Sequence, residues 1–188
     1  MQKINKDNVA IIVSSPFQAI CAIEAINKFD LYSCIFYLPG NDRSIQMTMD
    51  FLGDRGYTYV NTENTTSALR LIKKYKNYKK FDTILVGDYF AANHFILSLL
   101  WTRRNSTIIY IDDGNSTLSL LPPLSRKRFN EGSNIRRLFY RLLLLYNKIR
   151  GLRNLFFSCF DIRSSDFPMQ LVHNSFETLK HHSIQNIS

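Results

Sequence analysis

Residues 9–27 have the sequence VAIIVSSPFQAICAIEAIN. The run from Val9 to Ser14 is apolar up to its last residue and leads into Ser15 and Pro16. Such a run is typical of a fully buried parallel strand. Pro16 suits the first turn of a helix, because its missing N–H would have no partner there. Apolar residues then recur at helical spacing as far as Asn27. This stretch therefore predicts a strand followed directly by a helix, which is the first half of a β–α–β unit.

The same alternation of strand and helix continues downstream. Further strands are expected at residues 31–38, 57–60, 82–87 and 107–111, and further helices at residues 44–56, 65–75 and 90–103. A regular β–α alternation of this kind predicts an α/β protein with a Rossmann-like, doubly wound parallel sheet. A sixth strand is expected at residues 155–160, and the tail from residue 166 is expected to be weakly helical at most.

The composition fits a single domain covering residues 1–188. Hydrophobic residues make up 45% of the chain and charged residues 21%, which excludes disorder as its main state. Three scattered cysteines are too few for a disulfide framework or a zinc site. The sequence contains neither a signal peptide nor an apolar stretch of the roughly 20 residues that a membrane helix needs. These observations predict a cytoplasmic protein.

The positive charge is concentrated in one segment. Residues 126–153 contain nine Lys or Arg and one acidic residue, so they carry +8 of the net +9 of the chain. Within them, basic and apolar residues alternate in a way that predicts a basic amphipathic helix, which could lie on an anionic membrane surface. Two alternatives remain: the apolar side packs on the sheet with its charges solvated, or the segment contacts a further domain.

Three loops follow the expected strands at the same edge of the sheet. In open parallel sheets, ligands bind beyond the carboxyl ends of the strands, where the strand order reverses. With a strand order of 3-2-1-4-5, the first, fourth and fifth strands are neighbours and their loops line one crevice. The candidate binding residues in these loops are Ser14, Ser15, Gln18, Asp88, Asn93, His94, Gly114 and Asn115.

The most distinctive of these loops begins with Asp112, Asp113 and Gly114. Adjacent carboxylates repel each other, which makes one of them a better proton acceptor, and glycine lets the backbone approach a ligand closely. Asp113 and Asp112 are therefore the candidate catalytic residues. The structural alternative is a polar turn in which an aspartate caps the chain.

The other candidates have structural alternatives too. Asp88 could cap the helix that follows it, and His94 could be a core histidine inside that helix. Ser14, Ser15 and Gln18 could cap the first helix. The sequence contains no G-x-G-x-x-G motif, P-loop, G-x-S-x-G elbow or Cys/His metal motif. A site in this chain would therefore work through carboxylates and hydrogen bonds.

Three segments resemble one family of enzymes. VAIIVSSPFQAICAIEAI (9–26), DTILVGDYFAANHFI (82–96) and TIIYIDDGNSTL (107–118) are similar to the amino-terminal half of bacterial sialyltransferases. The nearest are the lipooligosaccharide sialyltransferases of glycosyltransferase family 52 and the capsular polysialyltransferases. The resemblance spans roughly residues 9–175, and the Asp-Asp-Gly after a buried strand is its most specific motif.

The resemblance implies the acceptor-side, amino-terminal domain of a GT-B glycosyltransferase. Asp113 would act as general base on a hydroxyl of an acceptor glycan or glycolipid, in lipopolysaccharide or capsule biosynthesis. That hydroxyl would attack CMP-sialic acid with inversion, and neither a cofactor nor a metal is expected. The enzyme would be cytoplasmic, and residues 126–153 could hold it peripherally on the inner membrane.

The chain departs from the family in one respect. The donor-binding domain of these enzymes carries a His-Pro motif, and no His-Pro pair occurs here. Three interpretations follow: the chain is a fragment whose donor-binding domain lies elsewhere, it is a truncated gene product, or it has kept the fold and lost the donor-binding half. The alternatives are an inactive glycosyltransferase-fold protein that acts in binding or scaffolding, and a nucleic-acid-binding module that uses the basic segment. Since the motifs of known nucleic-acid modules are missing, no nucleic-acid partner is expected.

Overall fold

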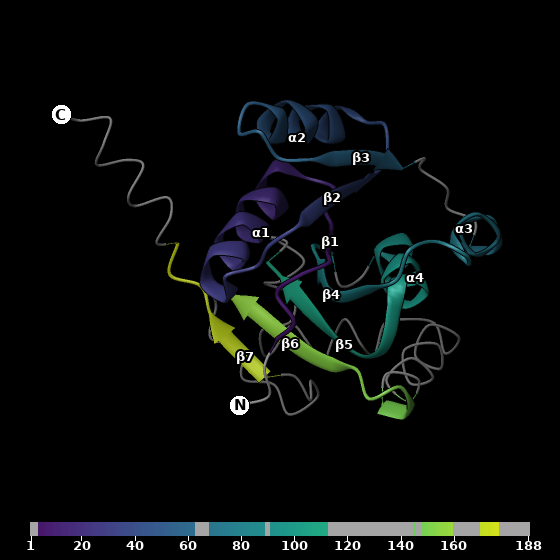
Figure 1. Ribbon diagram of the computed structural model, residues 1–188. Helices are drawn as coiled ribbons and strands as arrows, with labels where there is room; N and C mark the ends of the chain where they lie inside the picture. Colours follow the sequence, from purple (N-terminus) through teal and green to yellow (C-terminus); the bar gives the residue numbers. More distant parts are fainter. Residues whose placement is uncertain are drawn as a thin grey trace, which may run out of the picture.

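The computed structural model describes residues 4–62, 68–88, 91–112, 145, 148–159 and 170–176. Within these residues, seven strands form one parallel sheet in the order β3-β2-β1-β4-β5-β6-β7 (Figure 1). The strands are β1 (Val9–Ile12), β2 (Cys34–Pro39), β3 (Tyr59–Thr62), β4 (Phe81–Val86), β5 (Thr102–Ile111), β6 (Arg153–Ser158) and β7 (Gln170–His173). The helices are α1 (Pro16–Phe29), α2 (Arg43–Gly53), α3 (Ala68–Tyr75) and α4 (Ala92–Trp101).

The strand β1 lies near the middle of the sheet and is fully buried. It pairs with β2 on one side and with β4 on the other, so the strand order reverses between β1 and β4. The chain leaves β1 through a short loop into α1, which Ser15 caps by accepting a hydrogen bond from the backbone N–H of Gln18 (3.2 Å). The predicted order of the first five strands is therefore confirmed.

Helices cover both faces of the sheet, as the doubly wound prediction requires (Figure 1). Val9 and Ile11 of β1 point into a core shared with α1 and α2, whereas Ala10 and Ile12 point into a core shared with α3 and α4. The second core is centred on Trp101, which is fully buried. Four aromatic rings surround its indole, those of Tyr37, Tyr75, Tyr78 and Phe81.

The structure differs from the predicted elements in the last three strands of the chain, β5, β6 and β7. The strand β5 begins at Thr102, five residues earlier than predicted, and β6 begins and ends two residues before the predicted strand. The prediction that the tail is weakly helical at most is wrong for residues 170–173, which form β7. These residues are extended because their backbone pairs in parallel with β6, from Leu155↔Gln170 to Ser158↔His173.

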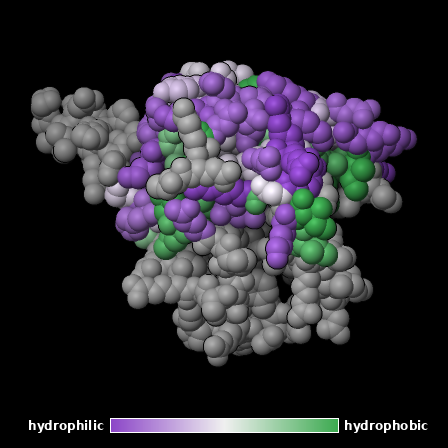
Figure 2. Space-filling view, turned by 60° about the horizontal axis from the view of Figure 1, so that its bottom comes forward, coloured by the Kyte–Doolittle hydropathy of each residue, from purple (hydrophilic) through white to green (hydrophobic). Residues whose placement is uncertain are grey.

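Most of the basic segment 126–153 lies outside the described residues. Of its predicted helix, Leu145, Lys148 and Ile149 are described, and all three are helical and exposed. In the described part of the chain, none of the helices combines the length and the hydrophobicity that crossing a bilayer requires. Among the described residues that are visible in Figure 2, most are hydrophilic, and the hydrophobic ones lie in a few separate areas.

Candidate functional site

The loops that follow β1 and β4 lie side by side at the carboxyl edge of the sheet. The N–H of Gly87 donates to the carbonyl oxygen of Ile12 (2.8 Å), which joins the ends of the two strands. A Cβ atom on Gly87 would lie 2.4 Å from the side-chain oxygen Oε1 of Gln18. A side chain at position 87 would therefore force the buried Gln18 side chain to shift, where the loop after β4 passes the start of α1. The predicted proximity of these two loops is confirmed.

The polar side chains after β1 hold their own loop in shape. Gln18 is 2% exposed, and its Oε1 accepts a hydrogen bond from the backbone N–H of Ser14 (2.8 Å). Ser44, at the start of α2, donates from its hydroxyl to the carbonyl oxygen of Ser14 (3.1 Å). Together with the Ser15 cap, these bonds fix the loop. The structure thus gives Ser15 and Gln18 the structural role that the sequence left open.

The loop after β4 is held by Asp88 and His94. Asp88 Oδ1 accepts from the N–H of Ala91 (3.1 Å), and the N–H of Asp88 donates to His94 Nδ1 (3.2 Å). Asn93 is half-buried, and its Oδ1 accepts from the N–H of His94 (2.9 Å). Asp88 thus organises the entry to α4, and His94 is a buried histidine whose Nδ1 serves as an acceptor.

Burial controls the protonation of His94. The side chain is 1% exposed, and the loss of hydration lowers its pKa to about 4, although the nearby Asp88 carboxylate acts in the opposite direction. A neutral imidazole with an unprotonated Nδ1 is also what the hydrogen bond from the N–H of Asp88 requires. His94 is therefore neutral in the folded protein at physiological pH.

Because His94 is buried in its neutral form, we expect the free energy of unfolding to decrease as the pH falls. Above pH 6.5 His94 is neutral in both states, but between pH 6.5 and about 4 only the unfolded chain binds its proton. The free energy of unfolding should fall by about 3 kcal/mol across this window. The His94→Asn variant keeps an acceptor near the position of Nδ1 but has no imidazole to protonate. Urea unfolding at several pH values should therefore show that this fall in the free energy of unfolding is absent from the variant. The exposed His173→Asn serves as control, and an unchanged pH dependence in His94→Asn would contradict the prediction.

Asp112, at the end of β5, is fully buried and bonded to the neighbouring strand. Its Oδ1 accepts from the hydroxyl of Ser158 (2.5 Å), and its Oδ2 accepts from the N–H of Cys159 (2.8 Å). Hydrogen bonds to an ionised carboxylate are stronger than those between neutral groups. Asp112 therefore clamps the carboxyl end of β5 to the carboxyl end of β6.

The clamp also affects the thiol next to it. Burial, with a smaller contribution from the negative charge of Asp112, raises the pKa of Cys159 to about 11. A thiol of this kind is protonated at neutral pH, which makes it a poor nucleophile. Cys159 thus serves this site as a hydrogen-bond partner of Asp112 and not as a nucleophile.

The remaining predicted site residues, Asp113, Gly114 and Asn115, lie outside the described residues. Sequence reasoning missed Ser158 and Cys159, the partners of Asp112. The sequence did contain one signal. The apolar run that begins at Leu155 ends in the polar residue Ser158, just as the apolar run of β5 is followed by the polar residue Asp112. Two adjacent parallel strands that end in polar residues bring those residues together at the same edge.

The part of the chain that the structure describes contains no group of three or more His, Cys, Asp or Glu side chains arranged to hold a metal ion. The described groups at the carboxyl edge are hydroxyls, amides, carboxylates and a neutral imidazole. This arrangement can accept and donate protons and hydrogen bonds.

Comparisons with known proteins give no family. No family model matches the chain, and no curated protein matches it. Among solved structures, the chain is similar to BdcA (YjgI) from E. coli, with a TM-score of 0.43 and 12% sequence identity. That alignment covers 84% of this chain and 86% of BdcA.

Proposed function

We propose that this chain is the acceptor-side domain of a sialyltransferase-like glycosyltransferase. The observation that supports the proposal best is the buried clamp from Asp112 to Ser158 and Cys159. It fixes the carboxyl end of β5 to that of β6, and β5 is the direct neighbour of β4, where the strand order reverses. The second carboxylate, Asp113, follows directly in the sequence from this fixed point. A site anchored in this way suits a general base, which must be held in a defined position.

In the proposed reaction, the Asp113 carboxylate removes the proton from a hydroxyl of the acceptor glycan or glycolipid. The hydroxyl oxygen forms a bond to the anomeric carbon of CMP-sialic acid. The bond between that carbon and the phosphate oxygen breaks, and CMP leaves with the bonding electron pair. Attack from the opposite side inverts the configuration. Asp112 acts in this scheme as a positioning residue, since its carboxylate is already engaged with β6.

The proposal is tested by giving the chain CMP-sialic acid and a panel of cell-surface glycans. Transfer would be followed by NMR, which also reports the anomeric configuration of the product. Acceptor binding without transfer, measured by saturation-transfer NMR, would support an acceptor-binding half that needs a separate donor-binding domain. A chain that neither binds nor sialylates any glycan of the panel would contradict the proposal.

We also propose that the basic segment 126–153 reaches an anionic membrane surface, which would place the protein peripherally on the inner membrane. Leu145 and Ile149 are 53% and 72% exposed. Because they are four residues apart, they lie on the same side of a helix. Lys148 is exposed next to them, and the segment as a whole carries a net charge of +8. Exposed apolar residues among basic ones are typical of helices that lie on membranes.

Replacing Leu145 and Ile149 with serine is expected to weaken binding to anionic vesicles at least several-fold, because it removes the apolar contacts. Co-sedimentation with vesicles containing phosphatidylserine measures the effect, and binding should fade at high salt. The control is Met47→Ser, since Met47 is also 53% exposed but lies on α2. Equal binding to neutral vesicles, or no effect of the double substitution, would contradict this role.

A further inference from the structure

The amino edge of the sheet is strongly basic where β4, β5 and β6 begin. The chain segments at these strand starts, residues 73–82, 102–107 and 148–153, contain ten Lys or Arg residues and one acidic residue, Asp82. Because α3 and α4 each connect two parallel strands, their carboxyl ends lie at this edge. The arrowheads of β5 and β6 in Figure 1 point away from it. Seven of the ten basic residues lie outside the basic segment 126–153.

Basic side chains tie these strand starts to one another. The amino group of Lys80 donates to the carbonyl oxygen of Leu100, and the guanidinium group of Arg103 donates to the carbonyl oxygen of Lys80 (3.0 Å). The guanidinium group of Arg150 donates to the carbonyl oxygen of Thr102 (3.2 Å). The segments that precede β4, β5 and β6 are therefore in direct contact, and their charges lie close together.

Much of this positive charge faces solvent. Five exposed residues form what we call the basic edge, and they are Lys76, Lys79, Arg103, Arg104 and Lys148. The acidic residue in these segments, Asp82, is paired with Arg103, with 3.1 Å between Oδ1 and Nε. Its charge is thus already compensated within the surface. The excess positive charge of the basic edge can attract an anionic partner.

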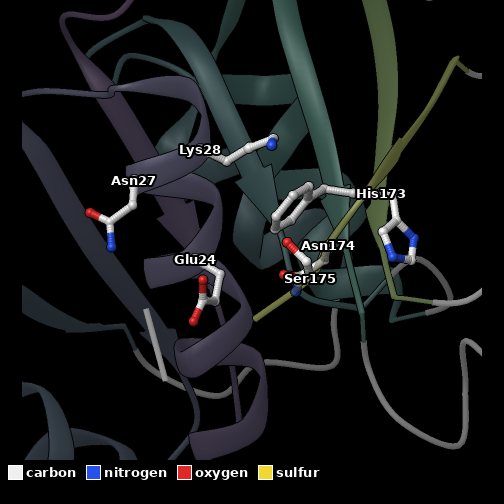
Figure 3. A pocket seen from close by; sticks show the side chains of 7 residues that line it. Glu24, Asn27, Lys28, His173, Asn174 and Ser175 are labelled. Carbon is white, nitrogen blue, oxygen red and sulfur yellow. The ribbon is translucent and has the colours of Figure 1, made fainter. Parts of the chain in front are cut away.

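The other half of the amino edge and the helix α1 carry charges of both signs. At the start of β1, Lys6 is paired with Asp30 (2.5 Å), and Asp7 is exposed next to it in the sequence. On α1, Glu24 lies one helical turn before Lys28 (Figure 3). The basic edge is therefore a local feature of the molecule and does not reflect a uniformly basic surface.

We propose that the basic edge lies on an anionic membrane, so that the candidate site at the carboxyl edge of the sheet faces away from the bilayer. A lipid surface is the partner that fits best, because the exposed apolar residues Leu145 and Ile149 adjoin Lys148. This choice of partner rests on the proposed membrane contact of residues 126–153. The charges at the starts of β4 and β5 are a separate observation.

The orientation has a consequence for the acceptor, which rests on the proposed sugar transfer. The six residues of β4 span about 20 Å from the amino edge to the carboxyl edge. The candidate site would stand about that far from the membrane. A lipid-linked acceptor would therefore need a glycan long enough to span this distance.

Removal of charge tests the basic edge apart from the basic segment. The double variant Lys76→Gln/Arg104→Gln changes two exposed residues that lie outside residues 126–153. Its binding to vesicles of phosphatidylserine and phosphatidylcholine, measured by co-sedimentation at low salt, is expected to weaken at least about 10-fold. The matched control is Arg43→Gln/Arg55→Gln, which removes the same charge from exposed residues at the two ends of α2. The control should bind much more tightly than Lys76→Gln/Arg104→Gln.

The orientation is tested by NMR of the ¹⁵N-labelled chain on bicelles of the same two lipids, with a nitroxide attached to some of the headgroups. The amide signals of Lys79 and Arg104 should broaden, because these residues would lie at the membrane surface. The amide signal of Gly87, which follows β4 at the carboxyl edge, should keep its intensity. Stronger broadening at Gly87 than at Arg104 would overturn the orientation.

The outcomes separate this inference from the proposed contact of residues 126–153. If Lys76→Gln/Arg104→Gln binds vesicles as tightly as the control, and only the substitution of Leu145 and Ile149 weakens binding, this inference is wrong and the contact of the segment stands. No binding to anionic vesicles by the unmodified chain would overturn both. Salt-sensitive binding of a random oligonucleotide that needs Lys76 and Arg104, without binding to vesicles, would overturn the membrane assignment in favour of a nucleic acid. The sugar transfer is assayed without membranes, so it is decided independently.

Discussion

Asp113→Asn is expected to lower the rate of sialic acid transfer by about 10²–10⁴-fold, the range that a positioned general base contributes. The amide has nearly the shape of the carboxylate but cannot accept the proton of the acceptor hydroxyl. Transfer would be measured with CMP-sialic acid and the best acceptor from the glycan panel, in the presence of a donor-binding domain if the chain needs one. Because the loss arises from the proton transfer, the affinity for the acceptor should change little.

Asp112→Asn is the matched control, because it alters the neighbouring residue by the same few atoms. An asparagine there can accept from the N–H of Cys159 and donate to the hydroxyl oxygen of Ser158, so the clamp is largely kept. This variant should retain most of the transfer rate. A full rate in Asp113→Asn, or a larger loss in Asp112→Asn than in Asp113→Asn, would show that the base is assigned to the wrong residue.

Asp112→Ala is expected to reduce the free energy of unfolding by about 2–5 kcal/mol. The change leaves the hydroxyl of Ser158 and the N–H of Cys159 without the acceptor that each has in the fully buried site. Each buried donor that loses its partner costs about 1–3 kcal/mol, and the removed side chain leaves a cavity. Urea unfolding followed by circular dichroism measures the difference.

Ser158→Ala separates the two halves of the clamp. It removes one of the donors and leaves the bond from the N–H of Cys159, so its cost should be about 1–2 kcal/mol and smaller than that of Asp112→Ala. An exposed carboxylate on α2, Asp50→Ala, should change stability by less than about 0.5 kcal/mol. If Asp112→Ala proved no more damaging than Asp50→Ala, the clamp would contribute nothing to the fold.

The sheet was predictable where its strands are apolar runs. β1 and β4 are buried on both faces and bounded by polar or proline-containing loops, so hydrophobicity alone locates them to within a residue or two. β7 was not predictable, because its four residues are partly exposed at the edge of the sheet and carry no alternation. Its extended conformation depends on the pairing with β6, which local sequence does not encode.

The candidate site was predictable only in part. Parallel strands end at one edge, so the proximity of the loops after β1 and β4 follows from the strand order. The roles within these loops were left open, since Ser15 and Asp88 are residue types that serve equally well as caps or as ligands. The clamp depends on a contact between Asp112 and Ser158, 46 residues apart, and the pairing of β5 with β6 creates it.

The central place of β1 has a consequence for biosynthesis. Of the seven strands, β1 is synthesised first. One of its two edges has no hydrogen-bonding partner until β4 pairs with it, from Val9↔Thr83 to Ile12↔Val86. Closing such a long segment of chain is entropically costly, and an exposed apolar strand edge invites pairing with other chains. A nascent polypeptide shorter than about Val86 therefore holds an incomplete sheet, and we expect ribosome-bound chains of that length to depend on chaperones most strongly.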